Sequence, residues 1–363
     1  MKKVTSNPVK VKRNQNTPRL SVGIDVHRKQ CAIAVWDGKE ISMDWTTPSD
    51  NTAVINSLNP LKELIKGIVY EAGPTGFSLA RALKSEGYSV QVAAPALIPR
   101  EPSKMNKTDR LDAAKLAQYL GIGMIKKFVT IPEEKEEDNR HLARILEQFK
   151  TNKNIAKNRI KSFLLFEGTK YGDSWSKMSR SKMLESVRSE DAKYSLGKLL
   201  EDLEHCEALV RDVRRRIRET VKKDEYLSER VKILASHPGV GKETAAVFAL
   251  EMFPGRKFKN ANQVGSFLGL APSVSSSGES EIRGSIIKKG RGELRRLLVQ
   301  CAWMWVRVDR AGNKKFLSLC EKTGSARKAI VAMARRLGIH LWKMLETGTC
   351  YNAKLHEHAI IAK

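Results

Sequence analysis

The chain has 363 residues, too many for one small domain and enough for two or three, and 41% are hydrophobic, which suffices for ordinary buried cores. Lysine and arginine number 66 against 40 aspartates and glutamates, a net charge of +26. Such an excess opposes compaction unless a polyanion is bound, so nucleic acid is the expected partner. No apolar run approaches the roughly 20 residues of a spanning helix, so we expect no membrane partner.

The five cysteines are scattered and form no CxxC pair, which argues against a disulfide framework and against a zinc site. The histidines do not cluster in the sequence either, so any metal ion must be held by carboxylates. The basic N-terminus is not followed by the apolar stretch of a secretory signal. We therefore expect a cytoplasmic protein, associated with the nucleoid of a prokaryote.

Residues 1–18 carry basic side chains and no acid, which predicts a disordered basic arm. An arm that contacts nucleic acid and a tail that only improves solubility remain alternatives. Residues 19–132 then alternate in the manner of an α/β domain. Apolar alternation predicts strands at 20–26, 31–36, 66–71 and 88–94. Helices are expected from a cap at Thr75 to a stop at Gly87, and over 109–120.

An acidic stretch at 133–138 marks the start of a second domain, residues 133–232. A basic helix is expected over about 138–166, followed by a helix whose apolar residues alternate four and three apart between Leu199 and Ile217. That spacing is the seam of a coiled coil, so the pair predicts an antiparallel coiled-coil arm, with a bundle inside one domain as the alternative. The arginines between 211 and 218 favour the arm, because they leave much of the helix solvated or on phosphate.

Glycines return in residues 233–363, which predict a third domain of mostly short helices and loops. The last helices are expected to run from Arg295 through Trp303 and over 325–345. We expect Trp303 and Trp305 to fill the core rather than to stack on bases.

Four carboxylates stand out in the first domain. Asp25 lies in the middle of an apolar strand, where a lone carboxylate is costly unless a cation or donors meet it. Glu71 ends a second apolar strand. Asp109 and Asp112 lie three apart and share a helix face, although an N-cap and a first-turn acid are structural alternatives for them. Such a set can bind a pair of magnesium ions that steady the attacking and leaving oxygens of phosphoryl transfer.

Three segments carry a family resemblance: Gly23-Ile-Asp-Val-His-Arg-Lys, Tyr70-Glu-Ala-Gly-Pro-Thr-Gly and Asn106-Lys-Thr-Asp-Arg-Leu-Asp-Ala. They resemble the three motifs of the DEDD insertion-sequence transposases. The resemblance implies an RNase H-like domain of the RuvC type, with Asp25, Glu71, Asp109 and Asp112 as metal ligands. Lys107 is then either a phosphate contact or a solvated lysine at a helix start.

The segment His237-Pro-Gly-Val-Gly-Lys-Glu-Thr-Ala is typical of a hairpin between helices. Glycines at a helix start bring backbone N–H groups close to a phosphate, so Gly239, Gly241 and Lys242 are candidate contacts for a DNA backbone. The segment is too short for a P-loop, and a plain tight turn is the alternative.

A serine-rich segment follows, Gly269-Leu-Ala-Pro-Ser-Val-Ser-Ser-Ser-Gly-Glu. By composition it is a flexible loop, but a serine near cations can also be a nucleophile whose developing phosphate charge is stabilised. The basic residues after it are candidate nucleic-acid contacts: Arg283, Lys288, Lys289, Arg291 and Arg295.

Residues 258–272, Ser277-Gly278, 287–290 and 294–298 resemble the C-terminal domain of the same transposase family. The resemblance implies that Ser277 is the nucleophile, with Ser275 and Ser276 as the neighbouring alternatives. Both matches occur in the expected order, with the helical arm between them. The fold class expected is therefore α/β plus α: an RNase H-like N-terminal domain, a coiled-coil arm and a mainly helical C-terminal domain.

The resemblance implies a DNA transposase that cuts and rejoins DNA with magnesium through a phosphoserine, at one composite site built from both terminal domains. It also implies an element-encoded guide RNA, and the coiled coil predicts a homodimer or tetramer. One alternative is a RuvC-like junction resolvase that uses metal-activated water. A non-catalytic scaffold is the other, although a scaffold has no use for Asp25 in a buried strand.

Overall fold

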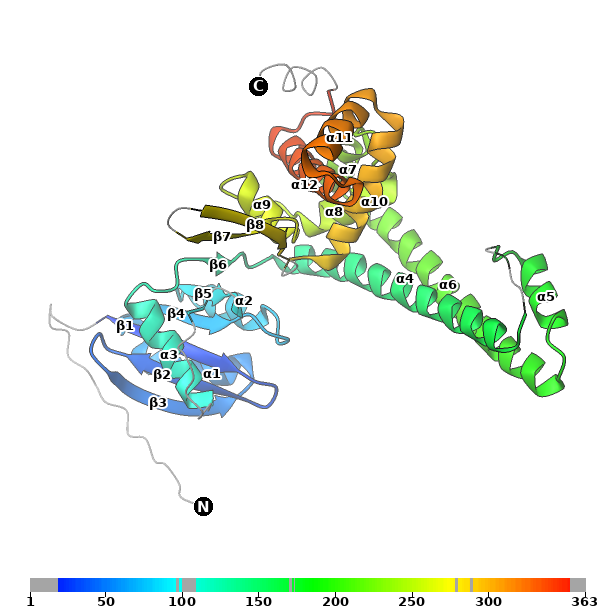
Figure 1. The fold of residues 1–363 in the computed structure, drawn as a ribbon. Helices are drawn as coiled ribbons and strands as arrows, with labels where there is room; N and C mark the ends of the chain where they lie inside the picture. Colours follow the sequence, from blue (N-terminus) through cyan, green and yellow to red (C-terminus); the bar gives the residue numbers. More distant parts are fainter. Residues whose placement is uncertain are drawn as a thin grey trace. The chain divides into compact units, whose positions relative to one another are not determined.

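The computed structural model describes residues 19–95, 98–99, 109–169, 172, 174–277, 280–287 and 290–352. The chain divides into two compact units, Met1–Glu133 and Glu134–Lys363 (Figure 1). The expected basic arm, residues 1–18, lies outside the described residues. Within the described ranges, no helix combines the length and the apolar character needed to cross a bilayer.

The described residues of the first unit form a six-stranded mixed sheet in the order β3-β2-β1-β4-β5-β6. The first three strands form an antiparallel meander, and β1, β4 and β5 run parallel. This confirms the expected α/β character. The strands are β1 (Leu20–Val26), β2 (Gln30–Trp36), β3 (Ile41–Pro48), β4 (Ile65–Glu71), β5 (Val90–Ala93) and β6 (Phe128–Val129).

Helices cover both faces of this sheet. Val22 and Ile24 of β1 pack with α1 (Asn51–Leu58) and α2 (Ser78–Ser85) in one apolar cluster, and the 3₁₀ helix η1 (Asn59–Leu64) follows α1. The other face packs against α3 (Asp109–Gly121), which meets small side chains of β2 such as Ala32 and Ala34. Because side chains alternate along β1, the residues on either side of Ile24 point toward α3.

One helix start differs from the expected one. Helix α2 begins at Ser78 with Phe77 at its N-cap, so the prediction that Thr75 caps it is wrong. Residues 74–77 form a turn instead, with Gly76 at a φ of 71°. The expected stop is confirmed, since α2 ends at Ser85 and Gly87 has a φ of 84°.

In the second unit two long helices pack along each other, α4 (Glu134–Phe166) and α6 (Glu190–Lys223) (Figure 1). Helix α5 (Lys177–Glu185) lies at their far end, where Met183 joins an apolar cluster with Leu164 and Leu196. Helix α4 starts within the acidic stretch, because acids in a first turn stabilise the positive end of the helix dipole. The coiled-coil geometry of this pair stays a prediction.

The rest of the second unit packs around a large apolar core that includes Phe248, Trp305 and Leu337. Trp305 is buried as expected, but Trp303 is 45% exposed and meets Phe316 edge-on, so the core prediction is wrong for Trp303. The two expected last helices are confirmed at Gly292–Val308 and Ala326–Thr347, whereas a β-hairpin forms where the sequence predicted a loop. The elements are α7 (Glu225–Ala235), α8 (Lys242–Glu251), α9 (Ala261–Phe267), β7 (Pro272–Ser277), β8 (Ser280–Ile286), α10 (Gly292–Val308), α11 (Arg310–Thr323) and α12 (Ala326–Thr347).

Candidate active site

Two carboxylates lie at one edge of the sheet because their strands are parallel neighbours. Ile24 of β1 pairs with Tyr70 of β4, so the next residues, Asp25 and Glu71, follow at the same carboxyl end. Asp25 also lies opposite Ala32 of β2. The carboxyl ends of parallel strands are where α/β sheets commonly form their sites.

Helix α3 brings the other two carboxylates to this edge. A Cβ at Gly23 would overlap the carbonyl oxygen of Ala113 and the amide nitrogen of Ala117, so only glycine allows α3 to lie this close to β1. Asp109 and Asp112 are in the first turn of α3. Together with Asp25 and Glu71 they line a cleft of about 1350 Å³.

A histidine lies between two of the carboxylates. Nε2 of His27 is 3.0 Å from Oδ2 of Asp25 and 3.3 Å from Oδ1 of Asp109. Within the described part of the chain, these three side chains form a cluster whose ligand atoms all lie within 4.8 Å of one another. The cluster could hold a metal ion, which agrees with the divalent-metal dependence that a DEDD-type domain suggests.

The electrostatics of the cluster favour a cation. Burial raises the pKa of Asp25, the charges of Asp109 and Asp112 raise it further, and the hydrogen bond with His27 opposes them. The same hydrogen bond raises the pKa of His27, which favours the protonated imidazole. The carboxylates of Asp25 and Asp109 thus face each other across the His27 imidazole. Their oxygens suit a hard divalent ion, whereas the imidazole nitrogen suits a transition metal.

His27 is absent from the predicted site, because the histidines are scattered along the chain. A usable signal was present: His27 follows Asp25 by two residues at the end of a strand, which puts both on one face. Two cations, Arg28 and Lys115, also line the cleft. Lys107, the predicted phosphate contact, lies outside the described residues.

The predicted nucleophile lies at the end of a strand rather than in a loop. Ser277 is the last residue of β7 and pairs with Ser280 across the hairpin. Ser275 and Ser276 precede it on the same strand. The described part of the structure does not include the side chains of these serines or of Arg283, nor any atom of Lys288 and Lys289.

The predicted hairpin between helices is the turn from α7 to α8. Gly239 has a φ of 85°, and a Cβ there would lie 2.8 Å from the carbonyl oxygen of Cys301 in α10, so its glycine is required for helix packing. Gly241 is the N-cap of α8, nothing lies within 4 Å of its Cβ position, and Lys242 is the first residue of the helix. This helix start is open on the side of Gly241.

Two of the predicted basic contacts are partly used inside the unit. Nη2 of Arg291 donates to both carboxylate oxygens of the buried Glu251, at 2.9 and 3.2 Å. Arg295 lies against Gly269, with its Nη1 buried. These arginines are therefore structural as well as candidate contacts for nucleic acid.

Comparisons with known proteins agree along the chain. Residues 231–317 match a family described as transposase IS116/IS110/IS902, and residues 22–167 match the DEDD domain of IS110 transposases. The transposase y4qE of Sinorhizobium fredii is 30% identical over 314 residues, 85% of this chain and 77% of that protein. The transposase for element IS1533 of Leptospira borgpetersenii is 26% identical, covering 90% and 95%. The transposase for IS1111A of Coxiella burnetii is 25% identical, covering 91% and 90%.

Proposed function

The chain belongs to the IS116/IS110/IS902 family of transposases, enzymes that cleave and rejoin DNA, and we propose that it does so with the carboxylates of the first unit and with Ser277. The observation that carries the proposal is the cleft lined by Asp25, Glu71, Asp109 and Asp112. Acids from three separate elements converge there, and a structural role for each acid alone does not explain why they meet.

The proposed fold of the first unit is RNase H-like. Its support is the strand order, an antiparallel meander of three strands continued by two parallel ones. In the second unit we propose a division near residue 232, between the long helices and a C-terminal domain that begins with α7. We further propose that α4 and α6 form a coiled-coil arm through which the protein makes dimers or tetramers.

Magnesium, as a pair of ions bound by the four carboxylates, would supply charge neutralisation at the scissile phosphate. The His27 imidazole lies between Asp25 and Asp109 and orients both carboxylates. Arg28 and Lys115, which line the cleft, offer cations to the DNA strand. Glu71 and Asp112 complete the oxygen donors of the cleft.

Ser277 is the proposed nucleophile. Its Oγ attacks phosphorus and forms a bond to it, the bond from phosphorus to the DNA oxygen breaks, and that oxygen leaves as a DNA hydroxyl carrying the proton that the serine gave up. The product is a phosphoserine diester that conserves the energy of the broken bond. A DNA hydroxyl then attacks the same phosphorus and releases Ser277, which rejoins the strands without an external energy source.

We propose an element-encoded guide RNA as a second nucleic-acid partner. The support is the net charge of +26, which is ample for two polyanions. The proposed nucleic-acid contacts outside the cleft are those of the basic segments: Lys107, Gly239, Gly241, Lys242, Arg283, Lys288, Lys289, Arg291 and Arg295.

Cleavage of a plasmid that carries the element's ends tests the proposal. Asp25→Asn should abolish cleavage at every magnesium concentration, whereas Asp44→Asn, on β3 outside the cleft, should cleave like the wild type. Ser277→Ala should also abolish cleavage, while Ser275→Ala and Ser276→Ala retain it. Undiminished cleavage by Asp25→Asn would refute the carboxylate site. Cleavage by Ser277→Ala would favour a nuclease that uses water.

A further inference from the structure

A buried carboxylate in the second unit has more arginine partners than it can neutralise. Glu251 ends α8 and accepts hydrogen bonds from Nη2 of Arg291 at 2.9 and 3.2 Å. Its oxygens also lie 3.4 Å from Nε of Arg144 and 3.5 Å from Nε of Arg140, both on α4. Three guanidinium groups therefore share one carboxylate.

A fourth arginine adds to this charge. The guanidinium carbon of Arg256 lies 4.6 Å from the ring centre of Phe253 and 4.4 Å from that of Phe267, so it is held between two aromatic faces. Burial lowers the pKa of Arg256 to about 9, with Arg140 the next largest cause, and Glu251 only partly opposes them. The four arginines thus carry positive charge that Glu251 does not compensate.

The same geometry leaves donors unused on the accessible arginines. Glu251 engages only Nε of Arg144 and only Nη2 of Arg291, and no other side-chain partner for either occurs among the described residues. The side chains of Arg144 and Arg291 are 37% and 28% exposed, whereas that of Arg140 is 7% exposed behind them. Guanidinium groups fixed in this way present N–H donors in the geometry that phosphate oxygens accept.

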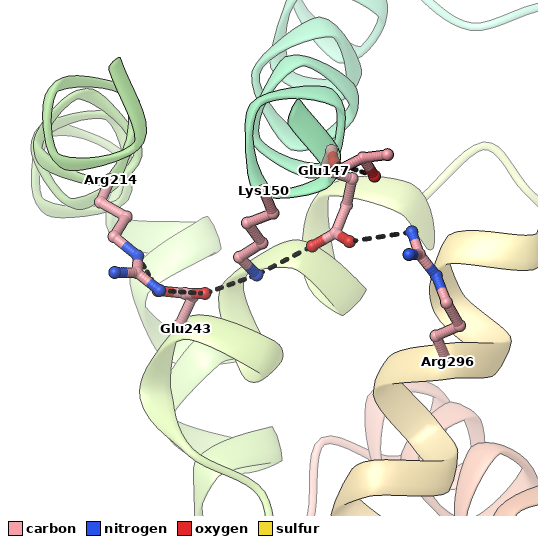
Figure 2. A network of polar contacts seen from close by, with 6 residues as sticks. Glu147, Lys150, Arg214, Glu243 and Arg296 are labelled. Atoms are coloured by element: carbon pink, nitrogen blue, oxygen red, sulfur yellow. Dashed lines mark hydrogen bonds and ion pairs between the residues drawn. The ribbon is translucent and has the colours of Figure 1, made fainter. Parts of the chain in front are cut away.

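A neighbouring network has a more even balance of acids and cations (Figure 2). Arg214 engages Glu243 through two nitrogens, Nε at 2.6 Å and Nη2 at 3.3 Å. Lys150 bridges Glu243 and Glu147 at 2.7 and 2.8 Å, and Arg296 reaches Glu147 at 3.4 Å. Here two acids serve three cations. Arg214 is 36% exposed, much as Arg144 is, but Nε and Nη2 of Arg214 both lie against the same acid.

We propose that Arg144 and Arg291, held by Glu251 and backed by Arg140 and Arg256, bind a backbone phosphate of double-stranded DNA. Arg291 is also the N-cap of the 17-residue helix α10, whose N-terminal dipole favours an anion at the same place. The inference rests on the proposed function because it takes DNA as the partner. It concerns binding, which needs neither magnesium nor Ser277.

The test measures how the full chain binds a short labelled DNA duplex in magnesium-free buffer. Fluorescence anisotropy gives the binding constant K at each of several salt concentrations. Arg144→Gln and Arg291→Gln should each weaken binding several-fold. Each should also make the slope of log K against log salt shallower by about 0.9 for the lost phosphate contact. Arg180→Gln is the control, because Nε, Nη1 and Nη2 of Arg180 already donate to the carbonyl of Trp175, to Glu204 and to Glu207, and its slope should equal that of the wild type.

Unchanged slopes for both Arg144→Gln and Arg291→Gln would overturn the proposal, as would an equal change for Arg180→Gln. A loss confined to an RNA hairpin, with duplex DNA bound normally, would overturn it too. If Arg144→Gln does not fold, Arg144→Lys decides: it keeps the charge, loses the planar donors and should bind with intermediate affinity. Wild-type affinity in Arg144→Lys would contradict the donor argument. If the wild-type protein does not cleave DNA but the two variants still show the shallower slopes, only the proposed chemistry is refuted and the phosphate site stands.

Discussion

Gly23 of β1 lies so close to Ala113 of α3 that any Cβ at residue 23 would overlap the carbonyl oxygen of Ala113. This contact sets how near α3 comes to the sheet. It therefore sets whether Asp109, at the start of α3, reaches the His27 imidazole that Asp25 also holds. The carboxylate cleft depends on a residue that has no side chain.

Gly23→Ala should destabilise the first unit by about 1–3 kcal/mol, because the added carbon forces α3 away from the sheet. Urea unfolding, followed through the fluorescence of Trp36 and Trp45, measures the change. Gly67→Ala is the matched control, since a Cβ there meets its nearest atoms at 3.6 and 3.7 Å, and its effect should stay within about 0.5 kcal/mol. If both variants lose the same free energy of unfolding, the close approach of α3 to β1 at Gly23 does not contribute to stability.

Magnesium should raise the melting temperature of the wild type, because an ion that binds only the folded cleft stabilises the folded state. At a magnesium concentration one hundred times Kd this stabilisation is about 2.7 kcal/mol. Asp25→Asn removes a ligand and should lose this stabilisation. Asp44→Asn is the control, because Asp44 pairs with Arg110 at 3.5 Å and does not line the cleft. If magnesium raises the melting temperature of Asp25→Asn as much as that of Asp44→Asn, the ion binds elsewhere.

The local parts of this site were predictable from the sequence. Apolar alternation identified β1 and made Asp25 conspicuous as an acid inside it, and helical spacing identified α3 from its first residue, Asp109. The role of Gly23 was not predictable, because it depends on a helix that the chain adds about 90 residues later. The ion pair of Arg291 with Glu251, 40 residues apart, was hidden for the same reason.

The serine-rich segment shows where composition misleads. Serine and glycine predict a loop, yet residues 272–277 form strand β7 because β8 pairs with them, with Val274 opposite Arg283 and Ser276 opposite Glu281. Strand formation here is a property of the pair rather than of either segment. The expectation that Thr75 caps a helix failed similarly, since a capping side chain is common in turns as well.

Glu251→Gln should destabilise the second unit in a pH-dependent way. Burial alone would raise the pKa of Glu251, but Arg291, Arg140 and Arg144 hold it below its ordinary value of 4.5. Its charge therefore stabilises the fold above that pH, and this contribution is lost as the pH falls through the lowered value. We expect a loss of about 3–5 kcal/mol in Glu251→Gln at neutral pH, shrinking in acid.

Urea unfolding at several pH values measures this difference. Glu201→Gln is the control, because Glu201 is exposed and pairs with Lys198 alone among the described residues, so its removal should change stability little at any pH. The difference in free energy of unfolding between wild type and Glu251→Gln should shrink in acid. If it stays constant from neutral pH into acid, the arginines do not stabilise the charge of Glu251.

The covalent step can be observed directly by mass spectrometry of the protein after reaction with magnesium and a duplex carrying an element end. The account predicts a peptide with a nucleotide attached at Ser277, present in the wild type and missing in Asp25→Asn and Ser277→Ala. Cut DNA with an unmodified protein, and equal cutting by Ser277→Ala, would contradict it.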